Sequence, residues 1–444
     1  MTPRLAAIGL AMALLAPLAC GAPTLGELPA RCTDGSCPDG FSCIHAVCAR
    51  PDQIVPITVA ELPFLRGVDL RILPEPEPEP AGFLVAWQTY AYGPDGEGFV
   101  VARLGLDGSV SAPMRFGVDF AADTGATEPS YDLVRLEGGH LLLAVSAAPV
   151  PDDPAAEPRL AAYRITLPSP GNEAQGAKSE HVWTAEARLS TAGYGAVSSP
   201  RFAVSATDVQ LGYLGTRVDQ MAHATIAELD VFAIDPAFKS PVVPTIAATY
   251  PARAGLPVAV GVARALPVTG GTYWILDSAR PSALFVSDGN DAPTETTLAR
   301  LAIGLTASTG SLTYLRPSTR TGQKLATDPV AGPAEIHRIS QGKSDVVLAG
   351  IVPVRDTPGP AWIDRPALPS LLITPGGDVD AEQIGVYSID SATGKTTTVS
   401  FVDRLSSRSL AGAGAAVSGG KLAIVWAEES GATVTVRAAI VGEP

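Results

Sequence analysis

Short apolar segments separated by turn residues repeat along most of the chain. One unit, YDLVRLEGGHLLLAVSAA at Tyr131–Ala148, has an alternating strand pattern, a polar turn and then a more apolar strand pattern. Most units are followed by a further strand-like segment, such as PRLAAYRITL or TVTVRAAIVG. No run of about twelve residues has the 3.6-residue periodicity of an amphipathic helix. The pattern therefore predicts an all-β protein built from hairpins.

Seven of these units lie between Val68 and the C-terminus. They occupy Val68–Tyr90, Tyr131–Ala148 and Arg201–Arg217, and segments that begin at Val258, Leu298, Ala334 and Gly412. A small antiparallel sheet repeated in this way predicts a β-propeller of about seven blades, with six or eight as neighbouring possibilities. Apolar runs such as KLAIVWAEE fit strands that adjacent blades cover on both faces. Tandem β-sandwiches are the structural alternative.

Two local motifs resemble known propeller repeats. FLVAWQTY followed by GFVVARLGLDGSV is similar to repeats of bacterial surface propellers, in which a "VAW" strand precedes an "ARL…DG" hairpin. SIDSATGKTTTV at Ser388–Val399 resembles the D-x-x-T-G-K hairpin of quinoprotein-type propeller repeats. The proline-rich run Pro74–Pro80 lies between the two strands of the first hairpin and is expected to be an extended excursion, with a domain linker as the alternative.

A ring of blades must join its two ends, because otherwise each end exposes an unpaired sheet edge. The segment Ile54–Ala60 alternates as a strand does and precedes the first hairpin without a partner of its own. We expect it to pair with Thr433–Val441 and complete the last blade. Residues 51–444 would then form one propeller domain, closed by strands from both ends.

Residues 1–19 have the layout of a secretory signal peptide. An uncharged apolar stretch follows Arg4 and is shorter than the roughly 20 residues that span a membrane. The next residues, PLAC-G, resemble the lipobox of bacterial lipoproteins, and this resemblance makes Cys20 the lipid-carrying first residue. Cleavage after Ala22 is the alternative. With lipidation, residues 20–30 would form the tether to the membrane.

Four of the five cysteines lie in residues 31–50, at Cys32, Cys37, Cys43 and Cys48. Their C-x4-C-x5-C-x4-C spacing lacks the C-x2-C pairs of zinc sites, so two disulfides are expected and metal is the alternative. So short a segment cannot bury a core, and cross-links must replace one. The spacing leaves the pairing open. The segment resembles small Cys-rich modules of secreted and surface proteins of myxobacteria and their relatives.

Composition narrows the possible partners of the large domain. Hydrophobic residues make up 46% of the chain and charged residues only 17%, so a folded domain is expected despite 40 prolines. The net charge of −14 disfavours nucleic acid, whose phosphates it would repel. No second apolar stretch is long enough to span a membrane. Contact with a membrane is therefore expected through the lipid alone.

Several fragments imitate catalytic motifs without completing them. Ala122–Thr127 contains one D-T-G triplet, but aspartic proteases need two aspartates that share a proton. Thr393–Thr396 and Gly342–Ser344 echo the end of a P-loop without its first glycine. Ala411–Gly420 lacks the third glycine of a dinucleotide fingerprint. All four are expected to be turns or strands.

Isolated polar and aromatic residues give no stronger signal of chemistry. The five histidines are scattered, at His45, His140, His181, His223 and His337. The DGND segment Asp288–Asp291 could offer oxygens to calcium but is expected to be a polar loop tip. Trp87 and Trp426 occupy matching places in the first and last units and are expected to pack between blades, with sugar stacking as the alternative. We therefore expect no catalytic residue, cofactor or metal.

Taken together, the sequence resembles a myxobacteria-like bacterial surface lipoprotein with a Cys-rich module and a propeller. The expected function is binding of an envelope protein or glycan through loops on one propeller face, without catalysis. The alternative is a propeller-type hydrolase with carboxylates at the central channel. Convergence of two or more Asp or Glu side chains within a few ångströms at the mouth of the central channel would distinguish the two. The expected location is the outer membrane or cell surface, or the periplasm without lipidation.

Overall fold

The computed structural model describes the strands and some of the connections between them. Described are residues 32, 36–44, 47–49, 54–63, 69–75, 82–88, 98–118, 130–136, 139–147, 159–185, 189, 192–204, 209–221, 224–234, 245–251, 259–268, 271–278, 283–287, 294–297, 303–306, 311–317, 334–340, 343–351, 361–363, 368–375, 383–389, 396–403, 409–430 and 433–443. For residues 245–351 only the backbone strands are described. None of the helical segments within these ranges is long and apolar enough to span a membrane.

The cysteine-rich module is a small cross-linked hairpin. Its strands β1 (Ser42–Ile44) and β2 (Val47–Ala49) pair antiparallel. Disulfides join Cys32 to Cys43 and Cys37 to Cys48, which supplies the pairing that the spacing left open. The sulfur atoms of Cys32, Cys37 and Cys48 lie within 4.8 Å of one another. Because all of them are in disulfides, none is a thiolate that could bind a metal.

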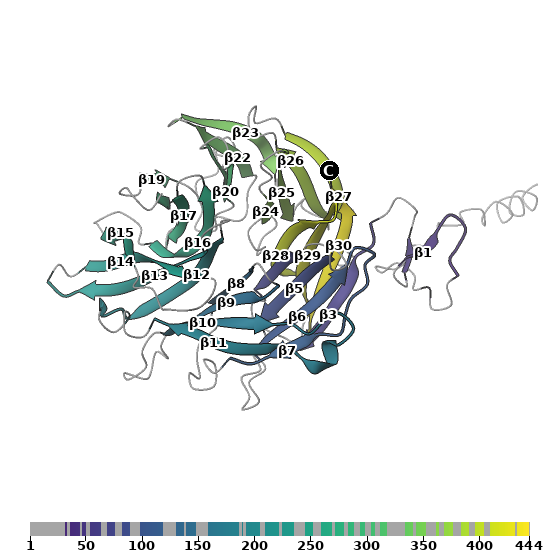
Figure 1. The fold of residues 1–444 in the computed structure, drawn as a ribbon. Helices are drawn as coiled ribbons and strands as arrows, with labels where there is room; N and C mark the ends of the chain where they lie inside the picture. The colour runs from purple at the N-terminus through teal and green to yellow at the C-terminus, as the bar shows by residue number, and fades with distance from the viewer. Residues whose placement is uncertain are drawn as a thin grey trace, which may run out of the picture.

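Beyond this module, the described strands form seven four-stranded antiparallel sheets, which Figure 1 shows arranged around a common centre. Blade 1 contains β4 (Leu70–Glu75), β5 (Gly82–Gln88), β6 (Phe99–Gly105) and β7 (Met114–Phe116); blade 2 contains β8 (Ser130–Arg135), β9 (Leu141–Ala147), β10 (Arg159–Thr166) and β11 (Lys178–Thr184); blade 3 contains β12 (Ala196–Val204), β13 (Val209–Asp219), β14 (Ala224–Ile234) and β15 (Thr245–Pro251). A short 3-10 helix, η1 (Glu173–Gln175), precedes β11.

The other four blades repeat the same plan. Blade 4 contains β16 (Ala259–Val268), β17 (Gly271–Ser278), β18 (Ala283–Ser287) and β19 (Thr294–Thr297); blade 5 contains β20 (Ile303–Thr306), β21 (Ser311–Pro317), β22 (Ala334–Ser340) and β23 (Lys343–Ile351); blade 6 contains β24 (Ala361–Ile363), β25 (Ser370–Pro375), β26 (Gln383–Ile389) and β27 (Thr396–Asp403); blade 7 contains β28 (Ser409–Ser418), β29 (Lys421–Ser430), β30 (Thr433–Gly442) and β3 (Ile57–Pro63). Seven such sheets make a β-propeller, in agreement with the expected fold.

The first strand of each blade is the innermost one. First strands of neighbouring blades contact one another in the series β20, β24, β28, β4, β8, β12 and β16. Where burial is described, second strands lie between two blades: every residue of β5 is buried, as are the residues from Leu422 to Glu428 of β29 (Lys421–Ser430). This explains the near-continuous apolar runs in the sequence, because a strand between two blades has no solvent-facing side.

Strands from opposite ends of the chain complete the seventh blade. β3 pairs antiparallel with β30, from Ile57 opposite Ala438 to Pro63 opposite Thr433. The sequence placed this strand at Ile54–Ala60, three residues earlier than the structure does. The pairing removes the free sheet edge that an open ring would leave.

The units counted in the sequence and the blades do not correspond one to one. The segments that begin at Leu298 and Ala334 were counted as two units, yet their strands β20 to β23 form one sheet. Blade 6, from Ala361 to Asp403, was not counted as a unit. These two errors cancel, so the number seven was reached although two assignments were wrong.

Apolar clusters between adjacent blades form the core. Trp87 lies in a cluster with residues of blades 1 and 7, and Trp426 in one with residues of blades 6 and 7. Their exposed fractions are 1% and 0%. Packing between blades is therefore confirmed for both tryptophans, and the sugar-stacking alternative is wrong.

The motif fragments lie where turns or strands were expected, as far as they are described. The described part of Gly342–Ser344 begins β23, where Lys343 pairs with Ser340 across the hairpin. Ala411–Gly420 runs along β28 into its turn, where Gly419 and Gly420 have positive φ. Ala122–Thr127 and Asp288–Asp291 lie outside the described residues, as do residues 1–31 with Cys20.

Candidate functional site

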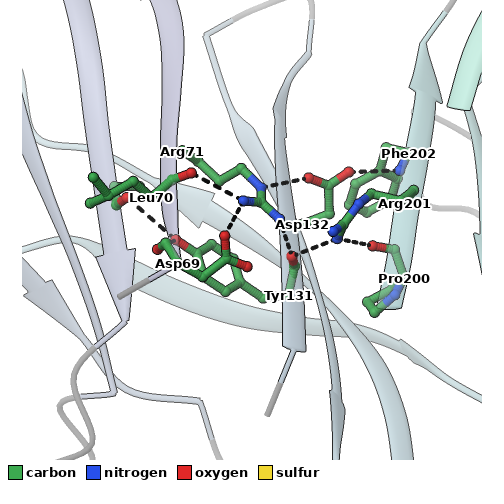
Figure 2. A network of polar contacts seen from close by, with 9 residues as sticks. Asp69, Leu70, Arg71, Tyr131, Asp132, Pro200, Arg201 and Phe202 are labelled. Atoms are coloured by element: carbon green, nitrogen blue, oxygen red, sulfur yellow. Dashed lines mark hydrogen bonds and ion pairs between the residues drawn. The ribbon is translucent and has the colours of Figure 1, made fainter. Parts of the chain in front are cut away.

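Charged side chains from three neighbouring blades meet at the innermost strands (Figure 2). Asp69 immediately precedes β4, and Arg71 is its second residue. Asp132 is the third residue of β8, and Arg201 lies on β12. We call Asp69, Arg71 and Asp132, together with Tyr131, the inner cluster. Its members come from segments about sixty residues apart, which only the ring arrangement brings together.

Arg71 is the centre of the inner cluster. Its Nε donates to Oδ1 of Asp132 at 3.1 Å, and its Nη1 forms an ion pair with Oδ1 of Asp69. Nη1 also donates to the Leu70 carbonyl at 3.0 Å, and Nη2 donates to the Tyr131 carbonyl at 2.9 Å. One guanidinium thus joins two carboxylates from two blades, a geometry that the rigid planar fork of arginine favours.

Asp132 continues this chain of contacts into blade 3. Its Oδ2 accepts a hydrogen bond from the backbone N–H of Phe202 at 2.8 Å. β12 is the edge strand of its sheet, and its pairing with β13 shifts just before Phe202, between Ser198 and Arg201, as at a β-bulge. Nη1 of Arg201 donates to the Tyr131 carbonyl at 3.2 Å.

The ring of Tyr131 packs against the guanidinium of Arg71. The ring lies 5.1 Å from the guanidinium carbon of Arg71, in cation–π geometry. Its hydroxyl donates to the Asp69 carbonyl at 2.7 Å and lies 3.3 Å from the Ala86 carbonyl. Burial, together with the negative charge of Asp69, raises the pKa of Tyr131 well above its usual value. The phenol therefore stays protonated and acts as a donor.

The charge of Arg71 is equally secure. Burial works against the charged form, but the carboxylates of Asp69 and Asp132 outweigh it, and the net result is a raised pKa. Arg71 is therefore a permanent cation between two carboxylates.

Exposure differs strongly within the inner cluster. The side chain of Asp69 is 42% exposed, whereas that of Arg71 is 19% and that of Asp132 is 12%. A carboxylate that is both exposed and held by a buried partner can meet a ligand without losing its position. The arrangement can bind a polar ligand, accept a proton, or stabilise positive charge.

Other buried polar groups in the described residues pair with one another. Glu75 and Arg103 pair at 3.2 Å, and Arg103 also pairs with Glu173. Backbone N–H groups at Gly171 and at Glu173 itself, and then Arg103, lower the pKa of Glu173. On β14, fully buried Asp230 accepts a hydrogen bond from the hydroxyl of Tyr213 at 2.7 Å. These groups stabilise blades, because at most a few per cent of Glu75 and Asp230 is exposed.

Sequence reasoning named no catalytic residue and missed the inner cluster. No local spacing reveals it, since its members are separated by whole blades. One signal was present: VDL at Val68–Leu70 and YDL at Tyr131–Leu133 both place an aspartate near the start of a first strand. An aspartate at the same place in two otherwise apolar repeats indicates that the two side chains lie close together around the ring.

The chain has no match among protein-family models, and no curated protein is similar to it in sequence. Solved structures do match. The polysaccharide lyase Uly1 has 10% identity and a TM-score of 0.48 over 93% of this chain and 94% of its own. An α-L-arabinofuranosidase of Fusarium graminearum has 12% identity and a TM-score of 0.45 over 87% and 98%. An α-L-arabinanase of Penicillium chrysogenum has 13% identity and a TM-score of 0.42 over 88% and 99%.

These findings correct the expected function. The expectation of a propeller that binds an envelope protein or glycan without catalysis is not carried further: the reported structures with a similar fold are glycoside hydrolases and a polysaccharide lyase. The alternative was a propeller-type hydrolase. Its distinguishing criterion was convergence of carboxylates at the mouth of the central channel, and the structure brings Asp69 and Asp132 onto one guanidinium, that of Arg71, at the first strands of adjacent blades.

Proposed function

We propose that this protein is a propeller-type hydrolase that cleaves a glycosidic bond at the inner cluster. The observation that supports this most is the meeting of Asp69 and Asp132, from adjacent blades, on one guanidinium at the innermost strands. Enzyme sites in propellers and related folds are grafted on the scaffold, so the proposal rests on these side chains and not on the fold.

The chemistry of glycoside cleavage suits such a site. The bond breaks through a transition state with positive charge on the sugar ring, and carboxylates beside the bond stabilise that charge or activate water. Arg71 holds both carboxylates in position, and the ring of Tyr131 packs against the Arg71 guanidinium. A site held in this way loses little free energy to rearrangement when the substrate binds.

The test is release of reducing ends by the purified protein. The substrates would be polymeric glycans of several classes, including arabinan, sialylated glycans and uronate-containing polysaccharides. We expect cleavage of at least one class, and loss of that cleavage in the double variant Asp69→Asn, Asp132→Asn. The matched control is Glu180→Gln, which removes a carboxylate paired with Arg164 on the outer strands of blade 2. Failure of the wild-type protein to cleave any glycan would refute the proposal.

We also propose that the protein is exported and carries a lipid on Cys20, as the lipobox resemblance implies. Metabolic labelling with palmitate should mark the protein, and Cys20→Ala should abolish the label. A mature N-terminus at Pro23 would instead indicate ordinary cleavage after Ala22.

A further inference from the structure

We infer that Asp69 is the catalytic residue of the inner cluster, and that Asp132, Arg71 and Tyr131 position it. The assignment rests on the proposed function and divides the work within that site. It follows from which carboxylate oxygens already accept hydrogen bonds or ion pairs within the protein, and from how exposed each side chain is.

Both carboxylate oxygens of Asp132 already accept a hydrogen bond from a buried donor of the protein. Oδ1 accepts from Nε of Arg71 at 3.1 Å, and Oδ2 accepts from the backbone N–H of Phe202 at 2.8 Å. Its side chain is also only 12% exposed. Each oxygen keeps a second lone pair, but the low exposure of the side chain limits the access of a substrate to it, and turning the carboxylate toward solvent would break these buried hydrogen bonds.

Asp69 is the opposite case. Oδ1 forms the ion pair with Arg71, while no donor among the described residues reaches Oδ2. The side chain is 42% exposed, the largest fraction in the cluster. A carboxylate with one oxygen anchored and the other open to solvent is fixed in direction and still free to react.

Three contacts other than Asp69 hold the Arg71 guanidinium in position when a substrate binds. Asp132 holds its Nε, the Tyr131 carbonyl holds its Nη2, and the Tyr131 ring lies beneath the guanidinium. The hydroxyl of Tyr131 in turn donates to the backbone carbonyl of Asp69. Arg71 thus holds the side chain of Asp69, and Tyr131 holds its backbone. These two contacts fix the position of Oδ2.

The ion pair uses Asp69 in its ionised form, which makes it a proton acceptor. Its Oδ2 takes one proton from the attacking water, whose oxygen forms a bond to the anomeric carbon of the sugar. The bond from that carbon to the departing oxygen breaks, and the departing oxygen takes a proton from solvent. Asp69 then returns its proton to solvent, so that one water is consumed for each bond cleaved.

Single variants of the two aspartates test the assignment, on whichever glycan the wild-type protein cleaves. Asp69→Asn should lower kcat by about 100-fold or more with little change in KM and in the urea unfolding midpoint. Asp132→Asn should lower the unfolding midpoint and reduce kcat less. Glu180→Gln should change neither quantity.

Chemical rescue separates a reacting carboxylate from a positioning one. Added formate should restore part of the activity of Asp69→Ala, because the vacated place opens to solvent, and should not restore Asp132→Ala. Wild-type kcat in Asp69→Asn, or rescue of Asp132→Ala alone, would overturn the assignment while leaving the proposed function standing. No cleavage by the wild-type protein would overturn both.

Discussion

Asp132 holds two buried donors, and its removal should therefore be costly. Asp132→Ala leaves the backbone N–H of Phe202 and the Nε of Arg71 without their acceptor. Because the side chain is 12% exposed, solvent replaces these contacts poorly. We expect a loss of about 3 kcal/mol in the free energy of unfolding, measured by urea denaturation.

An exposed ion pair provides the comparison. Glu180→Gln removes the partner of Arg164 on the surface of blade 2, where the glutamate side chain is 64% exposed. The expected change is within about 0.5 kcal/mol, because water screens and replaces such pairs. Equal losses in the two variants would show that the inner cluster is as solvated as the outer surface.

Tyr131 should make stability fall at high pH. Burial raises its pKa in the folded protein above the usual value of 10.0, so the fold prefers the protonated phenol. The stabilisation is complete below about pH 10 and is lost as the pH rises above 10 toward the folded pKa. In Tyr131→Phe, the unfolding midpoint should be lower at neutral pH but should decline less steeply above pH 10. Parallel profiles for both proteins would contradict this prediction.

At the scale of elements, Gly215 on β13 leaves room for a buried ring. A Cβ at this position would lie within 3.0 Å of ring atoms of Tyr194. The hydroxyl of Tyr194 donates to Glu228 at 2.7 Å and lies 3.2 Å from Asp230. Gly215→Ala should displace the ring and cost roughly 1–3 kcal/mol in the free energy of unfolding.

Gly442 is the matched control for that substitution. It ends β30, and nothing lies within 4 Å of where its Cβ would be. Gly442→Ala should leave the unfolding free energy nearly unchanged. Equal unfolding free energies for the two alanine variants would show that the ring of Tyr194 does not require glycine at position 215.

The sequence indicated the blades well because their strands obey a local rule. A second strand such as β5 or β29 is buried on both sides, so its apolar run is visible without any knowledge of its neighbours. The grouping of strands into sheets is not local. The pairing of β21 with β22 spans residues 318–333, and nothing in the two segments distinguishes a hairpin within one blade from a passage between blades.

The inner cluster was beyond the reach of local patterns for a related reason. Asp69 and Asp132 are 63 positions apart, since 132 − 69 = 63, and each by itself is an ordinary acidic residue at a strand end. Only the contact of first strands around the ring brings them to Arg71. The β-bulge just before Phe202 likewise has no unique sequence signal beyond Pro200.

For the whole molecule, the pairing of β3 with β30 predicts which part of the N-terminal region matters for stability. Deletion of residues 53–62 removes most of β3 and exposes the edge of β30, so the thermal unfolding midpoint of the large domain should fall by several degrees. Deletion of residues 21–50, or reduction of the two disulfides, should leave that midpoint nearly unchanged. A large effect of reduction would show that the module stabilises the propeller.

The central claim is that water cleaves a glycosidic bond at carboxylates joined by Arg71. The most direct measurement is mass spectrometry of products formed in water enriched in oxygen-18. Each new reducing end should carry one oxygen-18 atom with the wild-type protein and with Glu180→Gln, and no product should form with the double variant Asp69→Asn, Asp132→Asn. Absence of cleavage by the wild-type protein, or unlabelled unsaturated ends formed by elimination, would contradict the account.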